Sequence, residues 1–228
     1  MRKINIAIDG PSGAGKSTVS NELAKRLGYI FVNTGSFYRT VAYFLLQNEV
    51  DILNEEKVVE FLDILNLKHQ ITIDDKENIY LDNKNITAAI RADLISKASS
   101  KIATYKKVRE FVVNTIQSIT KTNKGYIMDG RDTTFRIMPF AEVKIFLTAS
   151  SEERTKRRIK QNKELGYETN FDIVLKEIKA RDYQDTHREV DPLHKVNDAI
   201  EIDCTNMSFE NVVETIINIV KQKVENGE

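Results

Sequence analysis

Residues 10–17 read GPSGAGKS and come just after the apolar run INIAI at residues 4–8. This G-x-x-x-x-G-K-[ST] pattern after a strand predicts a glycine-rich turn whose backbone N–H groups converge on phosphate oxygens. A helix expected to begin near Ser17 adds the positive end of its dipole. Lys16 can reach the outer phosphates of a nucleotide, and Ser17 can offer a hydroxyl to magnesium. A chance glycine turn is the alternative, and the strand before it and the helix after it argue against chance.

The composition narrows the class of protein. The 228 residues suffice for one domain with an insertion. Lysine and arginine (34) balance aspartate and glutamate (34), which excludes a global field that would hold nucleic acid or an anionic membrane. The single cysteine, Cys204, excludes an internal disulfide. No apolar run approaches the ~20 residues of a membrane span, and the N-terminus lacks a signal-peptide pattern. We therefore expect a cytoplasmic protein with no membrane and no nucleic-acid partner.

Short apolar runs alternate with stretches of helical period, which predicts an α/β fold with a parallel sheet covered on both faces. The five expected strands are Ile4–Ile8, Tyr29–Val32, Tyr126–Met128, Val143–Leu147 and Ala199–Ile202. Ser150 and Glu153 form a capping-box pattern that predicts a helix after the fourth strand. A last amphipathic helix, about residues 209–224, is expected to close the fold.

One stretch breaks this rhythm. Residues 67–86 alternate apolar and polar side chains around a polar turn at 74–78, which predicts an antiparallel β-hairpin. We therefore place a small inserted lobe at about 63–93, flanked by helices near 55–65 and 93–104.

A second polar segment, NTGSFYR at residues 33–39, ends the second strand at the sheet edge where open α/β folds bind ligands. Ser36 can hydrogen-bond at the N-terminus of the following helix, and Arg39 can fork a phosphate. A plain helix cap with a solvated arginine is an equal alternative. A guanine-specific switch is disfavoured because NKGY at 123–126 lacks the aspartate of N-K-x-D.

The third core strand runs into DGRD at residues 129–132. Asp129 matches the acid after a strand that organises magnesium water in phosphate-loop enzymes. Holding an arginine in place is a comparable alternative for this carboxylate. Arg131 is free to contact a phosphate or a substrate base.

After the fourth strand, Arg154, Arg157 and Arg158 lie at the start of a basic helix. If this helix closes over a nucleotide as a mobile lid, its arginines can neutralise charge on the transferred phosphoryl group. A solvated face or a nucleic-acid patch is the alternative.

Arg181, Asp185 and Arg188 fall at i, i+4 and i+7 in a helical run from Phe171, so we expect them to share one face. A surface ion-pair ladder is the favoured account of this stretch in isolation. The rival is a substrate clamp, with Asp185 on an amino group or ribose hydroxyl and the arginines on a monophosphate.

These pieces, in this order, resemble the bacterial cytidylate kinases, which phosphorylate CMP and dCMP with ATP. The matching motifs are IAIDGPSGAGKST at 6–18, TGSFYR at 34–39, ASSK at 98–101, VRE at 108–110, DGRD at 129–132, KIFLTASSEER at 144–154, and RDxxDxxR at 181–188 followed by Pro192-Leu193. They span nearly the whole chain, and the inserted β-lobe also matches. The resemblance implies a P-loop NTPase core with a five-stranded parallel sheet at 1–62 and 94–228. It also implies a basic lid at about 150–168 and a monophosphate-binding lobe at 63–93.

The resemblance implies roles for individual residues. ATP phosphates are expected at Gly10, Pro11, Ser12, Gly13, Ala14, Gly15, Lys16, Ser17 and Thr18, with Mg²⁺ on Ser17. CMP is expected at Ser36, Arg39, Ser100, Arg109, Asp129, Arg131, Asp132, Arg181, Asp185 and Arg188. The expected catalytic residues are Lys16, Arg131, Arg154, Arg157 and Arg158. The resemblance puts Asp185 on the sugar, and Ser100, Arg109 and Asp132 on the cytosine. Cytosine donates from its exocyclic amine where uracil accepts, so a carboxylate such as Asp132 can favour cytosine.

Two departures from the family pattern stand out. Family members generally carry glycine after G-R-D-x, whereas this chain has Thr134 within TTF at 133–135. Glu189 and Asp191 add negative charge between Arg188 and Pro192, which could weaken monophosphate affinity without changing the reaction.

We therefore predict a monomeric nucleoside monophosphate kinase that uses Mg·ATP and CMP or dCMP. Another acceptor, such as UMP, AMP or a non-nucleotide alcohol or acid, would keep the same chemistry. A regulatory nucleotide switch would ignore CMP, and a nucleic-acid-binding protein using the basic helix would show steep salt dependence.

Overall fold

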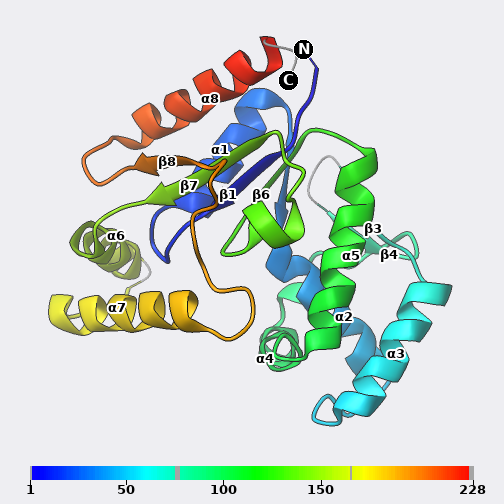
Figure 1. Cartoon of the computed structure of the whole chain (residues 1–228). Helices are drawn as coiled ribbons and strands as arrows, with labels where there is room; N and C mark the ends of the chain where they lie inside the picture. The colour runs from blue at the N-terminus through cyan, green and yellow to red at the C-terminus, as the bar shows by residue number, and fades with distance from the viewer. Residues whose placement is uncertain (1, 75–77, 165, 226–228) are drawn as a thin grey trace. The chain divides into compact units, whose positions relative to one another are not determined.

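The computed structural model describes residues 2–74, 78–164 and 166–225. It divides into two compact units: the first unit comprises Met1–Tyr29 with Lys124–Glu228, and the second unit comprises Ile30–Asn123. The strands of the main sheet are β1 (Ile6–Asp9), β2 (Ile30–Asn33), β6 (Tyr126–Gly130), β7 (Val143–Thr148) and β8 (Ile200–Asp203). Their order is β2-β6-β1-β7-β8, which confirms the predicted five-stranded α/β sheet (Figure 1).

The middle of this sheet is a run of parallel strands in the first unit. β1 pairs in parallel with β6 on one side and β7 on the other, and β7 pairs in parallel with β8. Ile6, Ala7 and Ile8 are fully buried, as expected for a central strand covered on both faces. In this register Asp9 lies beside Gly130, so the ends of β1 and β6 meet at one edge of the sheet.

The helices of the first unit are α1 (Lys16–Leu27), α6 (Ser151–Glu164), α7 (Phe171–His187) and α8 (Phe209–Glu225), together with the π-helix η2 (Thr133–Ile137). α1 packs against α8, and α6 packs against α7 (Figure 1). The predicted cap of α6 is confirmed, because the Ser150 hydroxyl accepts from the Glu153 N–H at 3.2 Å. α8 buries Val213 and Ile216, as its period predicted.

The second unit contains β2 and a helical cluster with a small sheet. Its helices are α2 (Thr34–Gln47), α3 (Glu55–Lys68), α4 (Asp93–Ile102) and α5 (Lys106–Thr122), with the short 3-10 helix η1 (Ala89–Arg91). The predicted hairpin is present as β3 (Ile71–Ile73) antiparallel to β4 (Ile79–Leu81), and β5 (Lys84–Asn85) adds a third strand that sequence reasoning missed. Residues 75–77 of the predicted turn lie outside the described residues.

α2 supplies much of the core of the second unit. It packs against α4 and η1 and buries Phe37, Val41 and Leu45. The second unit is wider than the predicted lobe at 63–93 and contains it entirely. Among the described helices, none is both long enough and apolar enough to cross a membrane.

Candidate active site

The phosphate loop leaves β1 through a position that only glycine fits. A Cβ at Gly10 would lie 1.9 Å from the Leu147 carbonyl oxygen of the neighbouring strand. Gly15, directly before α1, has a φ of 94°, in the left-handed region that favours glycine. The glycines at both ends of the loop are therefore dictated by backbone geometry, and α1 begins at Lys16.

Lys16 is folded back over this loop. Its Nζ donates to the carbonyl oxygens of Gly10 at 2.7 Å and Pro11 at 2.9 Å, and the residue is only 6% exposed. Burial lowers the pKa of Lys16 to about 7, and the nearby charge of Arg131 lowers it too, against the opposing effect of Asp129. An anion bound beside this buried amino group would stabilise its charged form and would itself be bound more tightly.

The carboxylate of Asp129, near the end of β6, lies beside the same loop. The Ser17 hydroxyl donates to Asp129 Oδ2 at 2.5 Å. Burial raises the pKa of Asp129, while the hydrogen bond from Ser17 and the charge of Lys16 oppose that rise. The sequence left two roles open for Asp129, organising magnesium water or holding an arginine. The hydrogen bond with Ser17 supports the first role.

The arginine that follows β6 is held by a different acid. Arg131 Nε donates to Asp185 Oδ2 at 2.6 Å, although 54 residues separate them. Arg188 Nη2 lies 3.6 Å from Asp132 Oδ2. This second ion pair joins the same two segments, the one after β6 and the one at the end of α7. These two long-range ion pairs take the place of the ion-pair ladder that was expected within the helix.

The prediction that Arg181, Asp185 and Arg188 share one helix face is wrong for Arg188. α7 ends at His187, and Arg188 has extended backbone angles of φ −62° and ψ 146°. Its Nε donates to the carbonyl oxygen of Asp191 at 2.7 Å. The chain has therefore already left the helix at Arg188, before it reaches Pro192.

Two arginines of the predicted lid helix hold the phosphate loop by its carbonyl groups. Arg154 is 5% exposed, donates to Asp182 at 2.8 and 2.7 Å, and reaches the Ser12 carbonyl at 3.0 Å. Arg157 donates to the carbonyl oxygens of Ala14 at 3.3 Å and Cys204 at 2.8 Å. The third, Arg158, bonds Gln161 on its own helix at 3.2 Å.

A pocket of about 420 Å³ brings loop and helix residues together. It is lined by Ser12, Gly13, Thr18, Arg157, Arg158, Gln161, Glu164, Val174, Glu177, Ile178 and Arg181. Its volume is in the range of small-molecule sites. The pocket thus unites predicted ATP-binding residues with two predicted lid arginines and Arg181.

The second unit holds the other four predicted contacts to CMP. Ser36 lies in the first turn of α2, which is capped at Asn33, so Ser36 is not the cap residue. Arg39 donates to the Ser36 hydroxyl at 3.3 Å, and its buried Nε has no hydrogen-bond partner among the described residues. Burial lowers the pKa of Arg39, and Arg91 lowers it further. Arg39 is half-buried and not freely solvated. A half-buried position is compatible with an arginine that binds an anion.

The remaining two lie on helices of that unit. Ser100 is exposed on α4 and donates to the Ser96 carbonyl at 3.1 Å. Arg109 is partly buried in the first turn of α5, and its N–H bonds the carbonyl of Tyr105 at 3.1 Å. Their roles toward a base stay predictions.

A family model described as cytidylate kinase matches residues 6–222 of this chain. The chain belongs to the cytidylate kinase family. A protein named cytidylate kinase from Mycoplasmopsis agalactiae is 53% identical over 222 residues, covering 97% of this chain and 99% of the relative. One from Bacillus subtilis is 43% identical, covering 97% and 98%. A solved structure of an uncharacterized protein from Eubacterium ventriosum shares the fold alone, with a TM-score of 0.53, 12% identity, and coverage of 97% and 99%.

Two buried or half-buried acids were missed as site residues although both stand inside motifs of the cytidylate kinase family. Asp9 is the acid of IAIDG, and Asp182 is the first acid of RDxxDxxR. Asp182 holds Arg154, and Asp9 accepts from the backbone N–H groups of Thr133 and Thr134. Their place inside these motifs could have indicated them, but a single sequence does not show which partner each acid contacts.

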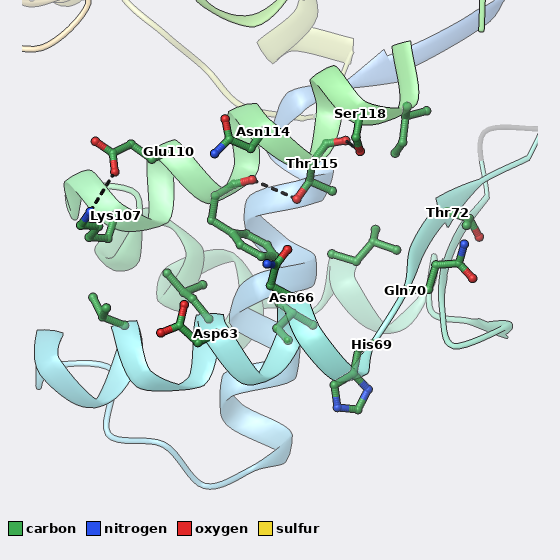
Figure 2. A pocket seen from close by; sticks show the side chains of 16 residues that line it. Asp63, Asn66, His69, Gln70, Thr72, Lys107, Glu110, Asn114, Thr115 and Ser118 are labelled. Atoms are coloured by element: carbon green, nitrogen blue, oxygen red, sulfur yellow. Dashed lines mark hydrogen bonds and ion pairs between the residues drawn. The ribbon is translucent and has the colours of Figure 1, made fainter. Parts of the chain in front are cut away.

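A larger hollow of about 750 Å³ belongs to the second unit alone. Figure 2 shows it between α3 and α5, with Asp63 and Asn66 on one wall and Asn114 and Ser118 on the other. None of the residues that the sequence predicted for ATP or CMP lines it. Ser12, Gly13 and Thr18, which the sequence predicted to bind ATP, line the smaller pocket of about 420 Å³ instead.

Proposed function

We propose that this protein transfers the γ-phosphoryl group of ATP to CMP or dCMP, giving ADP and CDP or dCDP. Relatives of near-equal length named cytidylate kinase support the reaction. The observation that carries it is the hydrogen bond at 2.5 Å from Ser17, the neighbour of Lys16, to Asp129 in β6, because Arg131 follows Asp129 by two residues. A donor-phosphate lysine and an acceptor arginine at one place are what transfer between two phosphates requires.

The chemistry needs positioning and charge neutralisation more than a protein nucleophile. An oxygen of the CMP phosphate attacks the γ-phosphorus in line, and ADP leaves. Both reactants are anions, so their repulsion must be screened before they can approach. Lys16 and the loop N–H groups hold the donor, while Arg131 holds the acceptor. Dipoles and cations fixed in advance do this without reorganising during the reaction.

The Ser17 and Asp129 pair fits a magnesium ion. Its hydroxyl and carboxylate oxygens, 2.5 Å apart, are hard donors of the kind that Mg²⁺ prefers. Magnesium keeps several waters and substrate phosphate oxygens, so one hydroxyl ligand and one acid beside the loop suffice. When bound, the ion would neutralise charge on the β and γ phosphates. Ser17 would hold it directly, and Asp129 would orient its water.

In the absence of CMP, the arginines proposed to bind its phosphate are paired with carboxylates, Arg131 with Asp185 and Arg188 with Asp132. We propose that the CMP phosphate takes the place of Asp185 at Arg131 and of Asp132 at Arg188, aided by Arg39 and Arg181. Each carboxylate is then released for the nucleoside: Asp185 for a sugar hydroxyl and Asp132 for the cytosine amine. From their places in the family motifs, we propose that Ser36, Ser100 and Arg109 also contact CMP. Phosphate is a better partner for a forked guanidinium than one monodentate carboxylate contact.

We also propose roles for the inserted lobe and for the lid segment. The lobe at 63–93 serves the monophosphate, and the segment at about 150–168, apart from residue 165 outside the described residues, serves as the lid. Arg154 and Arg157 connect that lid to the loop carbonyls, so lid position and loop shape are linked. Arg158 and Arg181 line the pocket beside Ser12 and Gly13, where they can contact ATP phosphates.

The test is ADP production from Mg·ATP with CMP, dCMP, UMP, AMP or no acceptor. We expect rates with CMP and dCMP at least ~100-fold above the no-acceptor rate, a barrier difference of ~2.7 kcal/mol. Lys16→Met should abolish the acceptor-dependent rate. Arg26→Met, on the exposed side of α1, should leave it unchanged. Equal slow hydrolysis in every reaction would refute the kinase and favour a switch, and activity confined to UMP or AMP would refute the cytosine assignment.

A further inference from the structure

Asp9, the last residue of β1, is a fully buried carboxylate to which the proposed reaction gives no role. It accepts three hydrogen bonds from one short segment. The backbone N–H of Thr133 donates at 2.9 Å, the N–H of Thr134 at 2.7 Å, and the Thr134 hydroxyl at 2.6 Å. A buried charge is costly unless it is hydrogen-bonded, so this carboxylate and that segment fix each other.

The segment that Asp9 holds is the π-helix η2, which starts directly after Asp132. The Asp132 carbonyl oxygen accepts from the N–H groups of Arg136 at 2.8 Å and Ile137 at 3.2 Å. The backbone of Asp132 is thus built into the first turn of η2. π-Helical turns are rare and occur frequently at functional sites. Asp9 binds the free N–H groups at the N-terminus of this turn, where negative charge is favoured.

The other side of η2 carries the segment after α7. The ring of Phe135 lies 4.2 Å from that of His194 between centroids, and Arg136 Nε lies 3.8 Å from Asp191 Oδ2. The Asp191 carbonyl in turn accepts from Arg188. η2, which includes Phe135 and the first departure from the family pattern, contacts the segment 188–194, which contains the second departure. η2 is therefore hydrogen-bonded to Asp9 and also contacts the segment that follows Arg188.

We propose that Asp9 is a positioning residue for the acceptor, acting through Thr134. The three bonds fix η2, and η2 fixes the backbone from which Arg131 and Asp132 project. In this chain Thr134 stands where the family generally has glycine, and its hydroxyl adds the third bond. The inference rests on the proposed function, because it assumes that Arg131 and Asp132 contact CMP. It adds that their direction, and hence the preference for cytosine, is set by a residue beside the phosphate loop.

Variants of Thr134 test this without touching the phosphate loop. Thr134→Val removes the hydroxyl but keeps the shape and the backbone N–H, and Thr134→Ser keeps the hydroxyl. Thr134→Val loses a hydrogen bond to a charged group, and we expect this loss to raise the KM for CMP about tenfold. The CMP to UMP ratio of kcat/KM should fall, while the KM for ATP stays within about twofold. Thr134→Ser should stay close to the unchanged protein.

Thr120→Val provides the matched control. Thr120 is also buried, and its hydroxyl donates to the Ile116 carbonyl at 2.9 Å within α5. It should lower the melting temperature without changing the KM for CMP or the base preference. Because the family pattern carries glycine at position 134, Thr134→Ala gives the same kinetic comparison if valine is not tolerated.

The outcomes separate this inference from the proposed function. If Thr134→Val lowers only the melting temperature, or raises the KM for ATP as much as that for CMP, Asp9 does not position the acceptor through the Thr134 hydroxyl, and the inference fails. If Thr134→Ser behaves like Thr134→Val, the hydroxyl is not the group that matters and the inference also fails. A parent protein inert toward every acceptor would refute the proposed function and this inference together.

Discussion

Nucleotide binding should be accompanied by proton uptake at Lys16, and raising the pH above 7 is the perturbation that reveals it. In the nucleotide-free protein Lys16 is 6% exposed, and its Nζ donates to the backbone carbonyls of Gly10 and Pro11. Burial lowers its pKa to about 7. Triphosphate oxygens beside Nζ stabilise the charged form, so binding raises this pKa again.

The magnitude follows from that pKa. With a pKa of about 7, Lys16 is about half neutral at pH 7 and about 97% neutral at pH 8.5. Binding should therefore take up about half a proton at pH 7 and nearly one at pH 8.5. The association constant should fall by up to about tenfold per pH unit above pH 7, until the raised pKa of the complex is reached.

Calorimetry can count this proton. We expect the binding heat of a non-hydrolysable Mg·ATP analogue at pH 8.5 to differ between two buffers in proportion to their ionisation enthalpies. Lys16→Arg, whose guanidinium stays charged, should bind without this buffer dependence. Identical heats for the unchanged protein in both buffers at pH 8.5 would show that Lys16 is already charged in the free protein, and would refute the reasoning.

Two further predictions concern groups that hold the first unit together. Asn5 is fully buried and accepts from the N–H groups of Gly125 and Tyr126, both at 3.1 Å. Asn5→Ala should lower the free energy of unfolding in urea by about 2 kcal/mol, because two buried donors lose an acceptor; a loss below about 0.5 kcal/mol would mean that water replaces it. Asp182→Ala should cost about 3 kcal/mol by leaving the Arg154 guanidinium buried without its carboxylate. Asp182→Asn should cost less, and equal stability of both variants would contradict a charge-based role.

Much of this fold could be read from local pattern. The strand, the glycine turn and the helix from residue 4 to residue 27 form one continuous motif, and the φ of 94° at Gly15 is a local requirement within that motif. The capping pair at Ser150 and the alternation that forms β3 and β4 are also short-range, because each depends on side chains within one turn or one hairpin.

The pairings that shape the site could not be read in this way. Asp185 meets Arg131 across 54 residues, and Asp9 meets Thr134 across 125. Each acid had nearer or equally suitable partners in the sequence, such as Arg181 and Arg188 on either side of Asp185. Spacing along a helix therefore favoured a ladder that the tertiary structure does not form.

The sequence by itself determined that a phosphate loop follows a buried strand in an α/β fold, and it carried the motifs of the family. Only the tertiary structure decided which carboxylate pairs with which arginine, where α7 ends, and that η2 is hydrogen-bonded to Asp9. Local patterns are set by periodicity and by steric limits on single residues. Long-range polar pairs depend on strand order and register, which place Asp9 beside Gly130, and on differences of about 1 kcal/mol between competing partners.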